Sequence, residues 1–258
     1  MSMMQNKQRA RAAALAALFG IGAGVVAPRL MAKPRQAEAQ PNAVNLMASA
    51  TPPAGAIMLF SGKAEEFSKN FYERYTKKDA AWTVDANGVA TPNHHDIVTK
   101  QEFGDVYFHG EFHEPLEEKS ADGKPSHSEG GNSGIGFQGR YEVQIYGSYG
   151  NPHPAVTDEG AFYSQKAPRV NAARKASEWQ TYDIFFRAPR LDADGKVTEQ
   201  PRATVILNGV VVQNNEAFNG PTGIQYGELK GQPKTGPLLL QGDHDPVMWR
   251  SAWVVPLN

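Results

Sequence analysis

The run from Gly130 to Gly150, GGNSGIGFQGRYEVQIYGSYG, constrains the fold more than any other part of the chain. Its glycines predict a tight turn that feeds a strand over residues 134–146. Within that strand Tyr141, Val143 and Ile145 alternate with polar residues, and successive side chains of a strand point to opposite faces. The alternation therefore predicts a sheet that packs on one face and presents polar groups on the other.

The chain after residue 54 repeats this character. Short runs of β-branched and aromatic residues are separated by turn dipeptides, of which Asn208-Gly209 is typical of a hairpin. Residues Lys63–Lys78 are expected to form a short helix or an irregular insert. About eleven short strands with few helices predict an all-β sandwich of the jelly-roll type. The strands are expected at 56–60, 81–84, 95–100, 104–113, 134–146, 160–164, 179–188, 202–208, 210–213, 236–241 and 247–256, with further turns at Asn87-Gly88, Asp122-Gly123 and Asp194-Gly195.

Composition narrows the range of functions. The chain has 258 residues and a net charge of −1, so its charge balance does not point to nucleic acid as a partner. It has no cysteine, which excludes disulfides, zinc–thiolate sites and a thiol nucleophile. The glycine-rich run lacks the Lys-Ser/Thr ending of a phosphate-binding loop, and the chain has no Gly-x-Ser-x-Gly nucleophile motif.

The N-terminal residues form a separate segment. A basic head is followed by an uncharged, mostly apolar run over Ala12–Val26. This layout predicts export to the periplasm, with residues 1–29 acting either as a signal peptide or as an inner-membrane anchor through residues 12–28. Residues 30–54 are rich in Ala, Pro, Gln and Asn and are expected to form a linker to a domain over residues 55–258.

A second predicted strand, over residues 104–113, also has one polar face. Its apolar residues alternate with a polar set made up of Tyr107, His109, Glu111 and His113. If this strand lies beside residues 142–146, the two polar faces would form a concave groove.

Five blocks of sequence, covering roughly residues 56–257, occur in the order of a known family. They are Leu59–Lys63; Asp96–Lys100, continuing through Asp105 to Glu111-Phe112; Asn132–Ile135 with Tyr141–Ile145; Gly160–Tyr163 with Glu178–Tyr182 and Leu207–Gly209; and Leu240–His244 with Pro246-Val247 and Arg250. In these blocks the chain resembles the 3-keto-disaccharide hydrolase family. The resemblance implies a concanavalin-like, laminin-G-like β-sandwich, usually exported, with a sugar site on the concave sheet; the N-terminal signal or anchor expected from residues 1–29 adds a helix before it.

The activity that the resemblance implies is cleavage of glycosides already oxidised to a ketone at C3. Such a ketone acidifies the C2 proton. Removal of that proton lets the C1 substituent leave by β-elimination, and water then adds to the enone. The site needs a general base, a general acid, and a donor or metal for the enolate oxygen. The expected partner is an oxidised oligosaccharide or glycoside; no cofactor is certain, and a divalent metal such as Ca²⁺ is an open option.

Three residues are candidate catalytic groups. Glu142 lies on the polar face of the best-matched strand and suits acid–base chemistry, unless that face is simply solvated. His244 lies in a Gly-Asp-His-Asp-Pro turn. It either takes part in the chemistry or only shapes that turn. Glu111 shares a strand face with His109, so the pair suits acid–base chemistry or a metal.

Four residues are candidate substrate contacts. Gln144 would bind a sugar hydroxyl, and His109 would act beside Glu111. Arg250 would grip a hydroxyl or stabilise an enolate, unless it is a structural ion-pair partner. Asn132 opens the matched strand block, where it either builds the turn or contacts sugar. No set of metal ligands is identified.

The chain departs from the family pattern at one position of functional weight. Gly147 stands where the resemblance implies a carboxylate, so Asp243 or Asp245 would have to compensate if that carboxylate is essential. Asp245, Ser251 and His113 are smaller departures. A second hypothesis is therefore a catalytically degenerate, membrane-anchored accessory subunit that meets a larger membrane complex through its N-terminal segment. A sugar-binding module without catalysis is a third.

Overall fold

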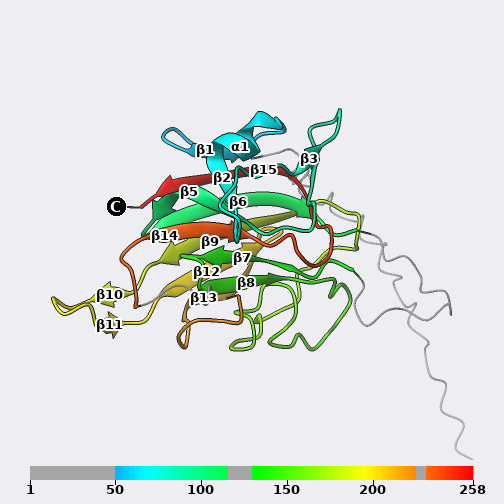
Figure 1. The fold of residues 1–258 in the computed structure, drawn as a ribbon. Helices are drawn as coiled ribbons and strands as arrows, with labels where there is room; N and C mark the ends of the chain where they lie inside the picture. The colour runs from blue at the N-terminus through cyan, green and yellow to red at the C-terminus, as the bar shows by residue number, and fades with distance from the viewer. Residues whose placement is uncertain (1–49, 116–129, 225–230, 258) are drawn as a thin grey trace, which may run out of the picture. The chain divides into compact units, whose positions relative to one another are not determined.

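The computed structural model describes residues 50–115, 130–224 and 231–257 (Figure 1). The predicted signal or anchor over residues 1–29 lies outside the described residues, as do the linker before Ala50 and the turn at Asp122-Gly123. Within the described ranges, no helix has the length and apolar character needed to cross a membrane.

The larger sheet has eight antiparallel strands. Their order is β13-β12-β9-β6-β15-β4-β3, with β1 also paired to β15. The strands are β1 (Ile57–Phe60), β3 (Thr83–Val84), β4 (Ala90–Thr91), β6 (Val106–His113), β9 (Gln180–Arg187), β12 (Arg202–Leu207), β13 (Val210–Ala217) and β15 (Met248–Pro256). Asn208 and Gly209 both have positive φ, at 51° and 82°, and join β12 to β13 in the predicted tight hairpin.

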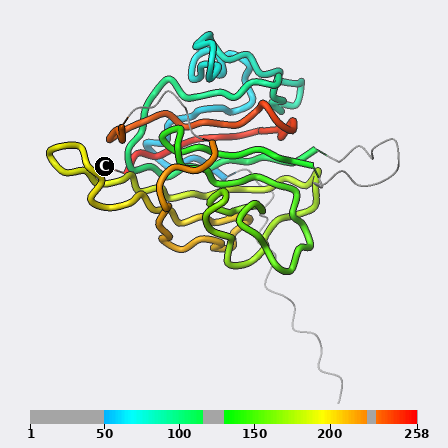
Figure 2. Tube along the Cα trace, turned by 60° about the horizontal axis from the view of Figure 1, so that its bottom comes forward, coloured from blue at the N-terminus to red at the C-terminus, as the bar shows by residue number. Residues whose placement is uncertain are grey.

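The smaller sheet has five antiparallel strands in the order β2-β5-β14-β7-β8. They are β2 (Phe71–Glu73), β5 (Ile97–Phe103), β7 (Ser133–Phe137), β8 (Tyr141–Ile145) and β14 (Gly236–Leu240). The short helix α1 (Glu65–Asn70) occupies part of the predicted insert, and a hairpin of β10 (Arg190–Leu191) and β11 (Val197–Glu199) projects beyond the sheets (Figure 2).

The two sheets pack face to face around one hydrophobic core. Phe137 of β7 makes an edge contact with Phe108 of β6, at 6.3 Å between ring centroids, and stacks on Phe186 of β9 at 4.7 Å. Tyr141 and Val143 of β8 are also buried in this core. Burial of so much apolar surface from both sheets is the main stabilising term. The all-β, concanavalin-like jelly-roll sandwich predicted from the sequence is confirmed.

Two of the predicted strands differ in the structure. Residues 134–146 are not one strand but the hairpin β7–β8, because Gln138 and Gly139 adopt positive φ values of 52° and 62° and reverse the chain. Residues 160–164 form no strand and make only isolated bridges through Phe162.

Residues 107–113 and 142–146 are not neighbours, so the condition for a shared groove is not met. The first segment lies in the eight-stranded sheet and the second in the five-stranded sheet. In both strands the apolar residues face the shared core, so the polar residues point away from it. The two polar faces are therefore on opposite outer surfaces of the sandwich.

Candidate functional site

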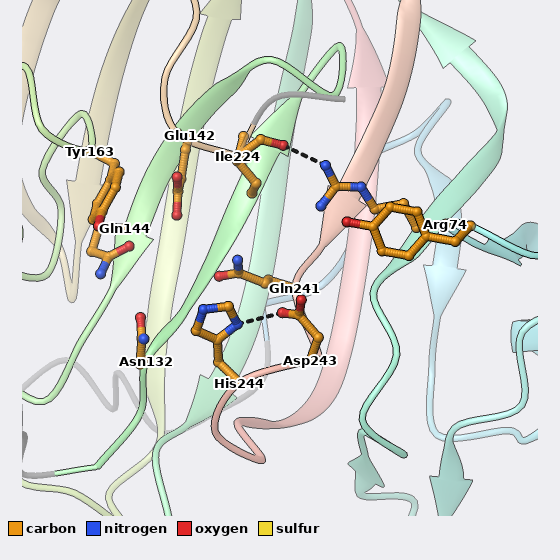
Figure 3. Close-up of a pocket in the computed structure, with 11 residues that line it drawn as sticks. Arg74, Asn132, Glu142, Gln144, Tyr163, Ile224, Gln241, Asp243 and His244 are labelled. Carbon is orange, nitrogen blue, oxygen red and sulfur yellow. Dashed lines mark hydrogen bonds and ion pairs between the residues drawn. The ribbon is translucent and has the colours of Figure 1, made fainter. Parts of the chain in front are cut away.

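A polar cavity of about 290 Å³ lies on the outer face of the five-stranded sheet. We call it the Glu142 cavity. Figure 3 shows Glu142 on one side of it, with Asp243 and His244 on another. Its lining residues come from β8, the residue before β7, the turn after β14 and three loops: Arg74, Tyr75, Asn132, Glu142, Gln144, Tyr163, Gly223, Ile224, Gln241, Asp243 and His244.

Glu142 is held tightly in this cavity. Its side chain alternates with core residues along β8, so it points outward, yet the residue is only 4% exposed. With its amide nitrogen turned toward the carboxylate, Gln144 donates to Glu142 Oε1 at 3.0 Å and to the Ser133 carbonyl at 3.1 Å. The carboxylate lies over Gly134, where an added Cβ would be 2.5 Å from Oε1. The glycine in the Asn132–Ile135 block therefore makes room for the acid.

The environment of Glu142 favours its protonated form. Burial raises its pKa to about 8, and the nearby Asp96 carboxylate adds to the rise, while Arg74 opposes it. At neutral pH Glu142 therefore carries a proton and can donate it.

Asp243 and His244 supply the opposite charge state. His244 Nδ1 and Asp243 Oδ1 are 2.5 Å apart. Burial tends to raise the pKa of Asp243, but hydrogen bonds, led by that of His244, outweigh it and lower the pKa. Asp243 is thus a carboxylate that orients the imidazole through Nδ1, and Nε2 is the ring nitrogen that Asp243 does not contact.

A buried carboxylate, Asp96, organises one wall of the Glu142 cavity. Its Oδ2 accepts from Arg74 Nη1 at 2.8 Å, and its Oδ1 accepts from the amides of Gly242 at 2.9 Å and Asp243 at 3.2 Å. Arg74 Nη2 also donates to the Ile224 carbonyl at 2.9 Å. One side chain thereby fixes both the Arg74 segment and the turn that carries His244.

Asn132 and Asp245 connect the same turn to β7. The Asn132 amide donates to Asp245 Oδ2 at 2.8 Å, and the Asp245 amide donates to the Asn132 carbonyl at 3.1 Å. Asn132 thus helps to build the turn and also lines the cavity, and its contact with a sugar stays a prediction. Asp245 is a structural link and does not line the cavity.

Three predicted site residues do not lie with Glu142. Glu111 and His109 on β6 and Arg250 on β15 form a separate cluster on the outer face of the eight-stranded sheet. Glu111 Oε2 accepts from Arg250 Nε at 2.5 Å, and Oε1 accepts from the Ala50 amide at 3.1 Å. Glu111 has no measurable exposure. These three residues therefore lie apart from Glu142, because β6 and β8 belong to different sheets.

His109 links this cluster to a third strand. Its Nδ1 lies 2.7 Å from Asp183 Oδ1, its Nε2 lies 3.5 Å from Glu111 Oε1, and its ring stacks on Trp253 at 4.8 Å. Burial alone would lower the pKa of His109, but the two carboxylates outweigh it and raise the pKa to about 9. The imidazolium is therefore part of a buried ion-pair network that ties β6, β9 and β15 together.

Comparison with known proteins shows the family to which the chain belongs. The 3-keto-alpha-glucoside-1,2-lyase-like domain matches residues 55–255. The chain belongs to this family. Membership makes it a sugar-active, hydrolase-like or carbohydrate-binding protein. No curated protein matches the sequence.

Two solved structures from Parabacteroides distasonis ATCC 8503, both of proposed glycosyl hydrolases, resemble the chain. The first is 37% identical with a TM-score of 0.68, and the match covers 80% of this chain and 86% of that one. The second is 17% identical with a TM-score of 0.54, covers 79% and 95% of the two chains, and supports the fold alone.

The family position occupied by Gly147 lies outside the Glu142 cavity. Gly147 is buried, and its amide donates to the Gly130 carbonyl at 2.9 Å. The lining of the cavity retains two carboxylates, Glu142 and Asp243. Asp243, rather than Asp245, is thus the acid available to work with Glu142.

The described side chains do not fit a resident metal. Among residues 50–115, 130–224 and 231–257, no three histidine, aspartate or glutamate side chains gather as a ligand set. In the Glu142 cavity, Asp243 is hydrogen-bonded to His244, and Glu142 is bound by Gln144. We therefore derive no step through a metal.

Several residues of the Glu142 cavity and its wall were not among the sequence candidates. Arg74, Asp96, Tyr163 and Gln241 bring charge or hydrogen-bonding groups to the cavity or its wall. Asp96, Tyr163 and Gln241 all fall in the matched blocks, which could have flagged them. Arg74 falls outside the blocks, in an insert without periodicity, and no sequence signal marks it.

Proposed function

We propose that this protein cleaves glycosides whose sugar carries a ketone at C3, by base-assisted elimination followed by hydration. One observation carries the proposal: a single cavity holds Glu142, whose pKa is raised to about 8, and Asp243, whose pKa is lowered. When the pKa values of two neighbouring acids are shifted in opposite directions, the one with the raised pKa suits a general acid, and the one with the lowered pKa can support a general base.

The chemistry balances with these groups. His244 Nε2 takes the C2 proton, and the electron pair forms the enolate of the C3 ketone. The enolate collapses to a C1–C2 double bond as the C1–O bond breaks. Glu142 gives its proton to the departing oxygen. Water then adds its hydroxyl to C1 and a proton to C2, releasing the free 3-keto sugar.

The other cavity residues suit binding and orientation. Asp243 holds the His244 ring so that Nε2 accepts the proton, as in other carboxylate–histidine pairs. Gln144 fixes the Glu142 carboxyl through its side-chain amide nitrogen. The side-chain amides of Asn132 and Gln241 suit contacts with sugar hydroxyls and the enolate oxygen.

The test is turnover of a 3-keto-disaccharide in D₂O, followed by NMR. Wild type should release a 3-keto sugar that carries deuterium at C2. His244→Ala should lose both exchange and release, whereas Glu142→Gln should keep C2 exchange and lose about 10²–10⁴-fold in release, the typical contribution of a general acid.

Glu178→Gln is the matched control, since it removes an exposed carboxylate outside the cavity lining, and it should match wild type. Product released without deuterium at C2 would mean direct hydrolysis and would refute elimination. Full activity of Glu142→Gln would remove its role as the acid.

We also propose that the protein acts outside the cytoplasm. The basic head and apolar run over Ala12–Val26 support this. N-terminal sequencing of the protein from periplasmic and membrane fractions tests it. A mature N-terminus beyond residue 29 in the periplasm would indicate a signal peptide, and an intact N-terminus in the membrane an anchor; recovery of the intact chain from the cytoplasm would contradict export.

A further inference from the structure

A second, smaller hollow adjoins the Glu142 cavity. The two share Arg74, Tyr75 and Asp243, and beyond them the hollow is lined by Thr76 and by His94 and His95, among others. Its enclosed volume is only about 30 Å³, so it is no deep pocket. Its main feature is the exposed ring of Tyr75, which lines both hollows.

Tyr75 is both exposed and held in place. The residue is 66% exposed, the largest fraction among the exposed hydrophobic residues that the structure describes. The Arg74 guanidinium lies 4.9 Å from the centre of its ring, within cation–π range, and Arg74 is itself fixed by Asp96 and the Ile224 carbonyl. One ring face thus rests on an anchored cation while the residue stays open to solvent.

The far side of the hollow is equally well fixed. His94 has a left-handed φ of 65°, a conformation that costs a non-glycine residue of order 1 kcal/mol or more and tends to occur at functional sites. The neighbouring His95 carbonyl accepts from Trp82 Nε1 at 3.0 Å, which anchors the loop in the sandwich. Both imidazoles are exposed and can exchange hydrogen bonds with hydroxyl groups.

We propose that Tyr75, with Thr76, His94 and His95, forms a second sugar-binding position that takes the group released from C1. We call it the Tyr75 subsite. Its place rests on the proposed function, because Glu142 donates its proton to the departing oxygen. Glu142 and Tyr75 line the same cavity, and Tyr75 also borders the smaller hollow. A group that leaves C1 after Glu142 protonates its oxygen can therefore contact Tyr75.

The chemistry of the occupant follows from these residues. A planar ring with an exposed negative face suits the C–H-rich face of a pyranose. Imidazoles around it suit hydroxyls, and the acidic side chains of Glu73, Asp96 and Asp243 in the same lining argue against a phosphorylated leaving group. The expected leaving group is a neutral, hydroxylated ring, so the substrate is a disaccharide or a comparable glycoside.

The test compares two substrates with different leaving groups: a 3-keto-disaccharide of glucose and methyl 3-keto-glucoside. Tyr75→Ala should raise KM for the disaccharide by about tenfold, equivalent to roughly 1.4 kcal/mol, with little change in kcat and no change for the methyl glycoside. Tyr75→Phe keeps the ring and should match wild type. Tyr72→Ala, which removes another partly exposed tyrosine packed under Lys100, is the matched control.

The outcomes separate this inference from the proposed function. An equal change in KM for both substrates, or none, overturns the subsite. If wild type turns over neither substrate, the proposed function fails, and the subsite is judged by binding alone: NMR titration with trehalose and with methyl α-glucoside. Trehalose should then bind more tightly to wild type than to Tyr75→Ala, with methyl glucoside unaffected; equal loss for both would refute it.

Discussion

At the scale of single residues, Asp96 has the most consequences for the site. It is buried, and its two oxygens accept three hydrogen bonds, one from Arg74 and two from the turn that carries His244. It also raises the pKa of Glu142 through its charge, whereas Arg74 lowers it. Asp96 touches no reacting atom in the proposed mechanism, so it is a positioning residue.

Replacing Asp96 with Asn should move the pH dependence of the reaction. Glu142 must be protonated, so activity should fall as pH rises through its pKa of about 8. Asp96→Asn removes a negative charge near Glu142, which lowers that pKa and shifts the alkaline limb of kcat/KM to lower pH. Profiles from pH 5 to 10 check this, and a lower plateau with an unmoved limb would assign Asp96 a structural role only.

At the scale of elements, the β7–β8 hairpin places the acid. Its register pairs Gly136 with Glu142 and Gly134 with Gln144, so two glycines of β7 lie opposite the polar pair of β8. The carboxylate of Glu142 occupies the space above Gly134. A side chain there would collide with the catalytic group rather than with the core.

Gly134→Ala should therefore impair catalysis more than stability. The new Cβ would lie 2.5 Å from Glu142 Oε1, which forces the carboxyl to move. Moving the carboxyl of the general acid out of position is expected to lower kcat about 10-fold or more. Gly104→Ala is the control, since its nearest contact would be an ordinary 3.6 Å. Unchanged kcat in Gly134→Ala would show that the observed carboxyl position is not the reactive one.

The connection before Phe162 carries a buried acid, Glu159, that does not line the Glu142 cavity. Glu159 is fully buried beside Glu114, and Gln180 Nε2 donates to Glu114 at 3.1 Å and to Glu159 at 3.4 Å. Burial, and then the neighbouring carboxyl, raise the pKa of Glu159 well above its ordinary value. The folded protein therefore favours a protonated Glu159.

This acid should make the fold less stable as pH rises. A raised pKa in the folded state stabilises the fold below the unfolded value near 4.5, and that stabilisation is lost as pH rises toward the folded value. Glu159→Gln, which mimics the protonated form, should flatten the decline of Tm between pH 5 and 9. Glu142→Gln serves as a comparison because burial also raises the pKa of Glu142. Parallel Tm curves for Glu159→Gln and wild type would contradict a protonated Glu159 in the folded protein.

At the scale of the whole molecule, the sandwich separates chemistry from support. The Glu142 cavity lies on the outer face of one sheet, and the network of Asp183, His109, Glu111 and Arg250 lies on the outer face of the other. The hydrophobic core lies between them. Changes in one face should therefore leave the other intact.

Glu111→Gln tests this separation. It leaves the buried charge of His109 and the partly exposed Arg250 without their shared carboxylate, at a cost of about 2 kcal/mol. Tm should fall by roughly 4–8 °C in a domain of this size. Turnover at 25 °C should stay at the wild-type rate. A selective loss of kcat with unchanged Tm would return Glu111 to the list of catalytic groups.

The sequence by itself determined the class of fold, the family and the outward direction of Glu142 and Gln144. These follow from local information: a two-residue period, turn dipeptides and short blocks in order. Only the tertiary structure decided which strands are neighbours. It put β6 and β8 in different sheets, and it joined Asp96 to Gly242, 146 positions away, with Arg74 on the same carboxylate. Such pairings depend on how all strands together bury their apolar faces, and no local pattern encodes that sum.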